Sequence, residues 1–237
     1  MTMTKHRWRR RVVWLLAAVV VAPILAVAAL WPLTPSVDSA GQLVRANLAT
    51  HHSPELAALP RPDRVAQALI ATENSRFYQM PGIDLVSVVR VAFATLTGNR
   101  DTGGATLEQQ LAKNLYFPQD DGILTKVQEA ELAQKLDTSY TKDEVLRLYL
   151  ADAYFGQGFY GLPAAADGYF AKSSAQLSWS QASMLAGLVQ APSAYDPMIH
   201  LSAGRLRQRH VLNRLVASGV LSAAQADAAF AAPLGLR

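Results

Sequence analysis

The sequence predicts a mainly α-helical protein, on three observations. Beyond residue 60, apolar residues recur at the spacing of a helix face, as at Val65 and Leu69. A serine or threonine followed three residues later by glutamate or glutamine marks helix starts at Thr141, Ser178 and Ser222. No convincing run alternates apolar and polar residues, so no sheet is expected. With 237 residues, a net charge of +4 and no cysteine, the chain suits one medium-sized domain plus a small appendage, without disulfides or cysteine-bound metals.

A basic cluster and an apolar run begin the chain. Residues 1–11 hold one lysine and four arginines, and residues 12–31 are uncharged and almost wholly apolar. A helix needs about 20 residues to cross a bilayer, so we expect a cytoplasmic tail (1–11), a transmembrane anchor (12–31), a proline-containing linker (32–60) and an extracytoplasmic domain (61–237). The tripeptide Ala26-Val27-Ala28 resembles a signal-peptidase site, so a cleaved signal peptide is the alternative.

The first domain helix is expected to begin at Pro62 and to lead to Glu73. A carboxylate at the end of an apolar helix, before a turn-rich segment, suits a base of raised pKa in a cleft, although a surface glutamate is the alternative. Asp84 then caps a segment, residues 85–96, that is apolar nearly all round, so we expect it in the core or against lipid. Arg90 is its only full charge and needs a partner or a ligand phosphate.

The stretch 103–114 joins two glycines to a helix, with Thr106 as its expected N-cap. Free N–H groups at a helix start bind anions, amide side chains bind hydroxyls, and lysine offers a point charge. The pattern therefore suits phosphate or sugar recognition, with an ordinary amphipathic helix as the alternative. The candidate binding residues are Gly104, Thr106, Gln109, Gln110, Lys113 and Asn114.

Later helices carry further charged residues. Lys126 and Glu129 lie three apart in a helix predicted over residues 123–140, either as part of a site or as a surface ion pair of little energy. Glycines in the stretch 156–161 indicate a tight bend. A last long helix carries four arginines that we expect on a solvated face, with anionic lipid or glycan phosphate as the alternative: Arg205, Arg207, Arg209 and Arg214.

Five segments resemble, in order, the five motifs of the peptidoglycan glycosyltransferases of family 51. Residues 73–84 resemble EDxxFxxHxGxD, residues 103–114 resemble GGSTITQQLxKN, and residues 125–129 resemble RKxxE. Residues 149–172 are similar to YLNxxYxGxxxxGxxxAaxxYFGK, and residues 183–197 to AxLAGLxQAPSxYxP. The chain departs from the motifs at several positions: Asn74, Met80, Ala105, Leu107, Glu108, Thr125 and Ala151. Nothing in the sequence resembles a transpeptidase module.

The resemblance implies a lysozyme-like helical lobe, a smaller membrane-associated lobe, and polymerisation of lipid II into glycan strands with release of undecaprenyl pyrophosphate. Glu73 would be the catalytic base. Glu129 would be a second catalytic carboxylate that holds Mg2+ or orients the pyrophosphate. Arg90, Lys113 and Lys126 would bind the pyrophosphate, while the two glutamines of the second motif would bind sugar or phosphate oxygens.

The resemblance also implies a bacterial cytoplasmic membrane protein with its catalytic domain outside the cytoplasm. The expected partners are lipid II, the nascent glycan strand, the membrane and other cell-wall synthesis proteins, but no nucleic acid. Two alternatives stay open. One is a catalytically weak glycan- or lipid-binding relative, which the substitutions at Asn74, Met80, Thr125 and Ala151 favour. The other is a lysozyme-like enzyme that cleaves glycan with Glu73 and Glu129.

Overall fold

The computed structural model describes residues 14, 21, 31–59, 63–82, 105–118 and 122–237, and throughout these ranges the fold is helical. No strand occurs in the described ranges, which contain only an isolated bridge between Tyr154 and Tyr160. The elements are α2 (Ala40–Thr50), α3 (Arg64–Glu73), α5 (Leu107–Tyr116), α6 (Ile123–Ser139), α7 (Lys142–Asp152), α8 (Leu162–Phe170), the 3-10 turn η1 (Ser174–Gln176), α9 (Trp179–Leu188), α10 (Pro192–Tyr195), α11 (Leu201–Ala217) and α12 (Ala223–Ala231).

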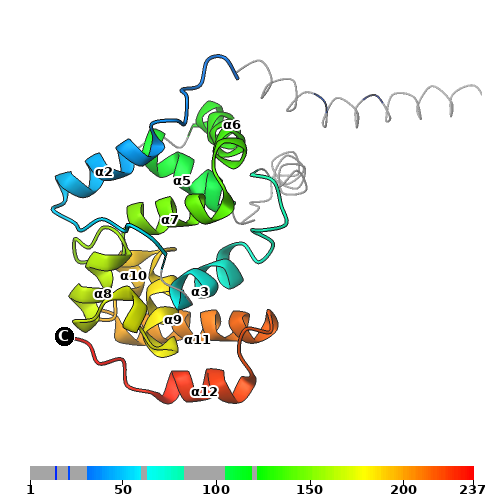
Figure 1. The fold of residues 1–237 in the computed structure, drawn as a ribbon. Helices are drawn as coiled ribbons and strands as arrows, with labels where there is room; N and C mark the ends of the chain where they lie inside the picture. Colours follow the sequence, from blue (N-terminus) through cyan, green and yellow to red (C-terminus); the bar gives the residue numbers. More distant parts are fainter. Residues whose placement is uncertain (1–13, 15–20, 22–30, 60–62, 83–104, 119–121) are drawn as a thin grey trace, which may run out of the picture.

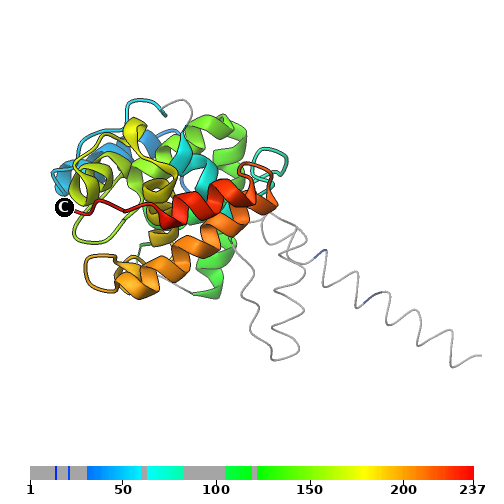
Figure 2. The same ribbon diagram turned by 90° about the horizontal axis from the view of Figure 1, so that it is seen from below.

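The helices form two groups (Figure 1). Helices α2, α5, α6 and α7 pack together on one side, and α3, α9, α11 and α12 on the other. Seen from below, α12 runs alongside α11 (Figure 2). One core of buried side chains extends through both groups, with Phe77, Tyr149 and Tyr169 among its largest members.

Local capping explains where several of the helices begin. The predicted capping boxes at Thr141, Ser178 and Ser222 are confirmed, and Thr106 forms a fourth with Gln109. In each case a side-chain oxygen accepts a hydrogen bond from a backbone N–H that the helix leaves unpaired. The predicted start at Pro62 is wrong by two residues.

Helix α3 begins at Arg64, because Asp63 is its N-cap and accepts a hydrogen bond from the Ala66 backbone N–H at 2.9 Å.

The predicted tight bend in the glycine-containing stretch 156–161 is confirmed as well. Gly156, Gly158 and Gly161 all adopt positive φ there, a conformation that glycine adopts without strain.

The predicted linker over residues 32–60 differs from the structure, because it contains α2. Val44 and Leu48 of α2 are buried in the common core, and α2 packs against α7. The prolines that suggested a linker lie outside the helix, so they do not interrupt its apolar face. This segment is therefore part of the folded domain.

Within the described ranges, no helix combines the length and the apolar character needed to cross a membrane. Nearly all of the predicted anchor, residues 12–31, lies outside those ranges, as do Gly104 and the apolar segment 85–96 with Arg90.

Candidate active site

Glu73 is the last residue of α3, and its carboxylate is held by Arg207 from α11. The Glu73 Oε1 atom accepts a hydrogen bond from Arg207 Nη2 at 2.7 Å. Both side chains are largely buried, with exposed fractions of 15% for Glu73 and 11% for Arg207. Burial raises the pKa of Glu73, while the charge and hydrogen bond of Arg207 work in the opposite direction. Burial has the larger effect, so the predicted raised pKa of Glu73 is confirmed in direction.

Two contacts place Arg207 and the end of α3. Gly187 of α9 lies against the Arg207 side chain, since a Cβ on Gly187 would sit 3.0 Å from Arg207 Cγ. A glycine here therefore leaves room for the arginine stem. Two turns further along α11, Arg214 donates a hydrogen bond from Nε to the Ala71 carbonyl at 3.0 Å. This carbonyl belongs to the last turn of α3, where backbone oxygens have no partner within the helix.

The prediction that the arginines of α11 face solvent is wrong for Arg207. The buried residues of α11 include Gly204, Gln208 and Val211. Arg207 lies three residues after Gly204 and four residues before Val211, so it shares their face of the helix. The helical spacing in the sequence is therefore a signal that Arg207 lies on the buried face of α11. Arg205 and Arg209 also have partners, since both stack on Phe230 of α12.

Tyr149 connects Glu73 to the second motif. Its side chain is fully buried in α7, and its hydroxyl donates to Gln110 Oε1 at 2.7 Å. Burial raises the pKa of Tyr149, and the neighbouring charge of Glu73 raises it further, so the phenol stays neutral. Gln110 in turn donates to the Ala105 carbonyl at 3.1 Å. The structure thus brings predicted residues Glu73 and Gln110 near one buried tyrosine.

Other residues of the second motif have structural contacts. Gln109 closes the capping box of α5 by accepting from the Thr106 backbone N–H at 2.9 Å, and the Thr106 hydroxyl donates to the Gly82 carbonyl at 2.8 Å. Asn114 lies beside Asp152 and hydrogen-bonds its carboxylate. Lys113 is half-buried on α5. These contacts position the segment, and they leave the predicted substrate contacts of the four residues untested.

Lys126 and Glu129 form the predicted pair on α6. Lys126 Nζ lies 3.0 Å from both carboxylate oxygens of Glu129. The Glu129 side chain is 7% exposed and that of Lys126 is 51% exposed, so the pair joins a buried anion to a solvent-accessible cation. An exposed ion pair would contribute little, whereas the burial of Glu129 makes its partner necessary.

The magnesium ion that the resemblance implies has one candidate ligand, Glu129, among the described residues. No group of three or more histidine, aspartate or glutamate side chains comes together there. Mg2+ is commonly bound by one or two carboxylates together with substrate phosphates and water, so Glu129 alone fits as one ligand when pyrophosphate is present. The residues that the structure describes do not by themselves form a protein cage for the ion.

Comparison with known proteins identifies the class of this site. The transglycosylase family model matches residues 43–216, which include Glu73, Glu129 and Arg207. The chain is 35% identical over 234 residues to "Putative transglycosylase H16_A0665" of Cupriavidus necator, covering 98% of this chain and 100% of that protein. It is 38% identical over 201 residues to penicillin-binding protein 1F of Bacillus subtilis, covering 84% of this chain and 28% of that protein.

Two further comparisons involve penicillin-binding protein 1A. The chain is 38% identical over 169 residues to that protein from Neisseria lactamica, covering 71% of this chain and 21% of the other. The crystal structure of the Haemophilus influenzae protein aligns with a TM-score of 0.46 at 24% identity, over 78% of this chain and 18% of that one. The chain therefore spans only about a quarter of the penicillin-binding proteins that it matches.

The chain belongs to the transglycosylase family, the peptidoglycan glycosyltransferases whose five motifs it carries.

Proposed function

We propose that this chain polymerises lipid II into glycan strands with release of undecaprenyl pyrophosphate. The observation that carries the proposal is the buried Glu73 carboxylate, in a member of the transglycosylase family. The reaction needs a base that takes the proton from the acceptor sugar hydroxyl, and a carboxylate whose pKa is raised toward neutrality suits that task.

Arg207 orients this base. It occupies Oε1 of Glu73, and among the described residues it is the only hydrogen-bond partner of that carboxylate. The other oxygen is therefore left to accept the substrate proton. Because the charge of Arg207 also opposes the effect of burial on the pKa of Glu73, it favours the ionised carboxylate that can act as a base.

The leaving pyrophosphate needs cations. We assign this task to Lys113, Lys126 and Arg90, which come from three segments of the chain. Lys126 is half-exposed while its partner Glu129 is buried, so the ammonium can turn toward an anionic ligand. Glu129 would contribute one ligand to Mg2+, a Lewis acid that would neutralise charge on the pyrophosphate.

We further propose that residues 12–31 anchor the chain in the bacterial cytoplasmic membrane, with the domain outside the cytoplasm. The support is the length of the uncharged run behind five basic residues. A lysozyme-like lobe beside a smaller membrane-associated lobe, formed in part by residues 85–96, is the arrangement that we expect. Neither a glycan-cleaving enzyme nor a binding-only relative is favoured by any contact in the described ranges.

The experiment is polymerisation of labelled lipid II by the purified full-length protein. Glu73→Gln should abolish elongation while lipid II binding persists, because it removes the proton acceptor and preserves shape. Glu55→Gln, at an exposed position, is the matched control and should behave as the parent. A parent that binds lipid II and never polymerises it would replace the enzyme proposal with the binding-relative reading, and polymerisation by Glu73→Gln at the parent rate would remove Glu73 as the base.

A further inference from the structure

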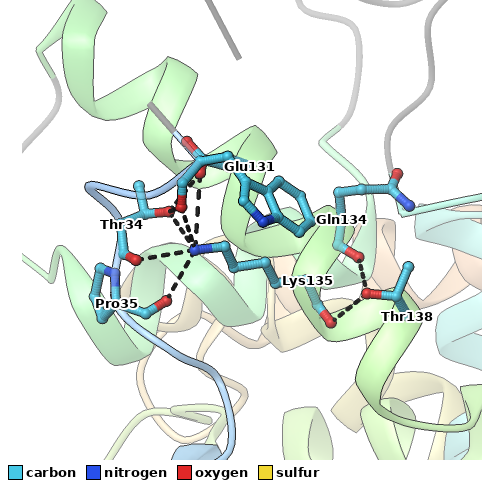
Figure 3. Close-up of polar contacts among 7 residues, drawn as sticks. Thr34, Pro35, Glu131, Gln134, Lys135 and Thr138 are labelled. Carbon is cyan, nitrogen blue, oxygen red and sulfur yellow. Dashed lines mark hydrogen bonds and ion pairs between the residues drawn. The ribbon is translucent and has the colours of Figure 1, made fainter. Parts of the chain in front are cut away.

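Glu131 is a carboxylate in an unexpected place. It lies on α6, two residues beyond Glu129, and is completely buried. Its Oε1 atom accepts a hydrogen bond from the Thr34 hydroxyl at 2.6 Å and lies 3.8 Å from the ammonium of Lys135 (Figure 3). Burying a carboxylate is costly unless partners compensate. These contacts offset part of that cost at Oε1, while Oε2 has no hydrogen-bond partner among the described residues.

Lys135 binds the backbone of the segment that precedes α2. Its Nζ atom donates to the carbonyl oxygens of Trp31 at 2.8 Å and Thr34 at 2.9 Å, and to the Thr34 hydroxyl at 2.7 Å. Pro35 is a longer contact at 3.4 Å (Figure 3). The same ammonium lies 5.0 Å from the centre of the Trp31 ring. One largely buried cation thus binds three backbone carbonyl groups of the non-helical residues 31–35.

The following residues are fixed as well. The Tyr140 hydroxyl donates to the Val37 carbonyl at 2.8 Å, and Val37 and Ala40 are buried in the core. In contrast, Trp31 and Leu33 keep exposed fractions of 42% and 72%. Backbone from 31 to 37 is therefore attached to α6 at its polar atoms, while two large apolar side chains point outward. Tryptophan is enriched at membrane interfaces, where such side chains are stabilised.

Stability alone does not require this arrangement. Well-packed apolar residues in place of a buried ion pair often leave stability unchanged or raise it. What the polar contacts add is direction, because each hydrogen bond fixes an angle as well as a distance. Lys126 and Glu129 lie on the same helix, with Glu129 about 9 Å from Lys135 along the axis at 1.5 Å per residue. Because residues 31–37 are attached at Lys135, they are also fixed in position relative to Lys126 and Glu129.

We propose that Thr34, Glu131 and Lys135 form a polar lock, which holds residues 31–37, at the end of the proposed membrane anchor, against α6. By fixing this segment, the lock sets the orientation of the active site relative to the bilayer surface. These three are positioning residues. The inference rests on the proposed function, since the lock matters for catalysis only if the substrate is membrane-bound lipid II.

The test replaces the lock by apolar residues in the full-length protein, as the triple variant Thr34→Val, Glu131→Leu and Lys135→Met. The variant should unfold at a temperature close to that of the parent, because no buried charge is left unpaired. Thr138→Val is the matched control, since the Thr138 hydroxyl bonds only to carbonyls of its own helix. Lys135→Met alone leaves Glu131 buried without its cation and should be destabilised.

Two readouts separate the lock from general damage. The chain has no cysteine, so Leu33→Cys and Leu124→Cys, both at exposed positions, accept a pair of spin labels. The parent and Thr138→Val should give one narrow label-to-label distance distribution, and the triple variant a broad one. In vesicles of phosphatidylethanolamine and phosphatidylglycerol, the triple variant should polymerise lipid II about tenfold more slowly than the parent. A short-chain lipid II analogue in solution should be polymerised equally by both.

A narrow distance distribution in the triple variant would overturn the lock. Equal loss with both substrates, or none with either, would overturn its role in membrane orientation. If the parent polymerises neither substrate, the proposed function fails, while the distance measurement still decides whether the lock exists.

Discussion

Replacing Arg207 with methionine is the sharpest test of how Glu73 becomes a base. Methionine keeps much of the stem volume and removes the charge and the hydrogen bond at 2.7 Å. Burial raises the pKa of Glu73, and Arg207 is what limits that increase. Without it, burial acts unopposed and the carboxyl holds its proton to higher pH. The acid limb of the pH–rate profile should therefore move to higher pH.

The magnitude follows from the geometry. A contacting opposite charge lowers a carboxyl pKa by about 1 to 3 units, and this pair is largely shielded from solvent. We expect the limb to move by about 1 to 2 pH units, so that the rate on the limb falls about 10- to 100-fold and recovers at higher pH. The free energy of unfolding of the variant changes with pH in the opposite direction to its rate. The folded variant binds the Glu73 proton more tightly than the unfolded chain, so its stability decreases as pH rises from the ordinary pKa of 4.5 to the raised value.

The assay is the initial rate of lipid II polymerisation across pH, with lipid II binding measured in parallel. Arg209→Met is the matched control, because Arg209 lies on the same helix and pairs with the exposed Asp227 instead. The Arg209→Met variant should have the acid limb of its pH–rate profile at the same pH as the parent. An Arg207→Met profile that superimposes on the parent profile would refute the reasoning, and so would a loss of rate that is uniform over all pH values.

Two further changes test contacts near the site. Tyr149→Phe removes the hydroxyl that donates to Gln110, and should lower the free energy of unfolding by about 1 to 2 kcal/mol in urea titrations, since the Gln110 oxygen loses its partner; unchanged stability would contradict this. Asp63→Asn keeps an oxygen for the Ala66 N–H but cannot ionise. Burial raises the pKa of Asp63, so the parent loses stability as pH rises above the ordinary value of 3.8, and the variant should lack that decline; equal slopes for the two proteins would exclude the effect.

Local signals predicted the fold well. The capping boxes at Thr141, Ser178 and Ser222 are contacts within four residues, so the sequence contains both partners. Helix α2 was missed because its burial depends on α7, far along the chain, and because the flanking prolines suggested a linker. The formation of a short helix whose buried face is Ala40, Val44 and Leu48 is decided by tertiary packing rather than by its own pattern.

The site was predictable only in part. Glu73 could be identified by its position after an apolar helix and by its motif, and its burial agrees with that choice. The sequence predicts a solvent-exposed Arg207, since arginines are usually exposed and its partner is 134 residues away. Helical spacing showed that Arg207 shares a face with apolar residues of α11, but no local rule identifies an ion pair between distant segments. The predicted convergence of Lys113, Lys126 and Arg90 stays a prediction, because Arg90 lies outside the described ranges.

Thr125 tests whether the departures from the family motifs weaken the enzyme. The third motif has arginine at this position, so Thr125→Arg is the obvious change for restoring a phosphate contact. Thr125 is 2% exposed, however, and lies three residues after the N-cap Gly122 of α6. A larger side chain in a filled site costs about 1 to 3 kcal/mol. A cation in the first turn opposes the helix dipole as well, by about 0.3 to 1 kcal/mol.

We therefore expect Thr125→Arg to lower the unfolding temperature and not to raise the rate of polymerisation. Leu124→Arg, at the exposed neighbouring position, is the control and should leave the unfolding temperature nearly unchanged. If Thr125→Arg raised the rate several-fold without loss of stability, a missing cation would limit this protein, and the reading of a weakened relative would gain its first support. The expected result instead makes Lys126 the cation that the third motif supplies, because it is the half-exposed member of a pair whose anion is buried.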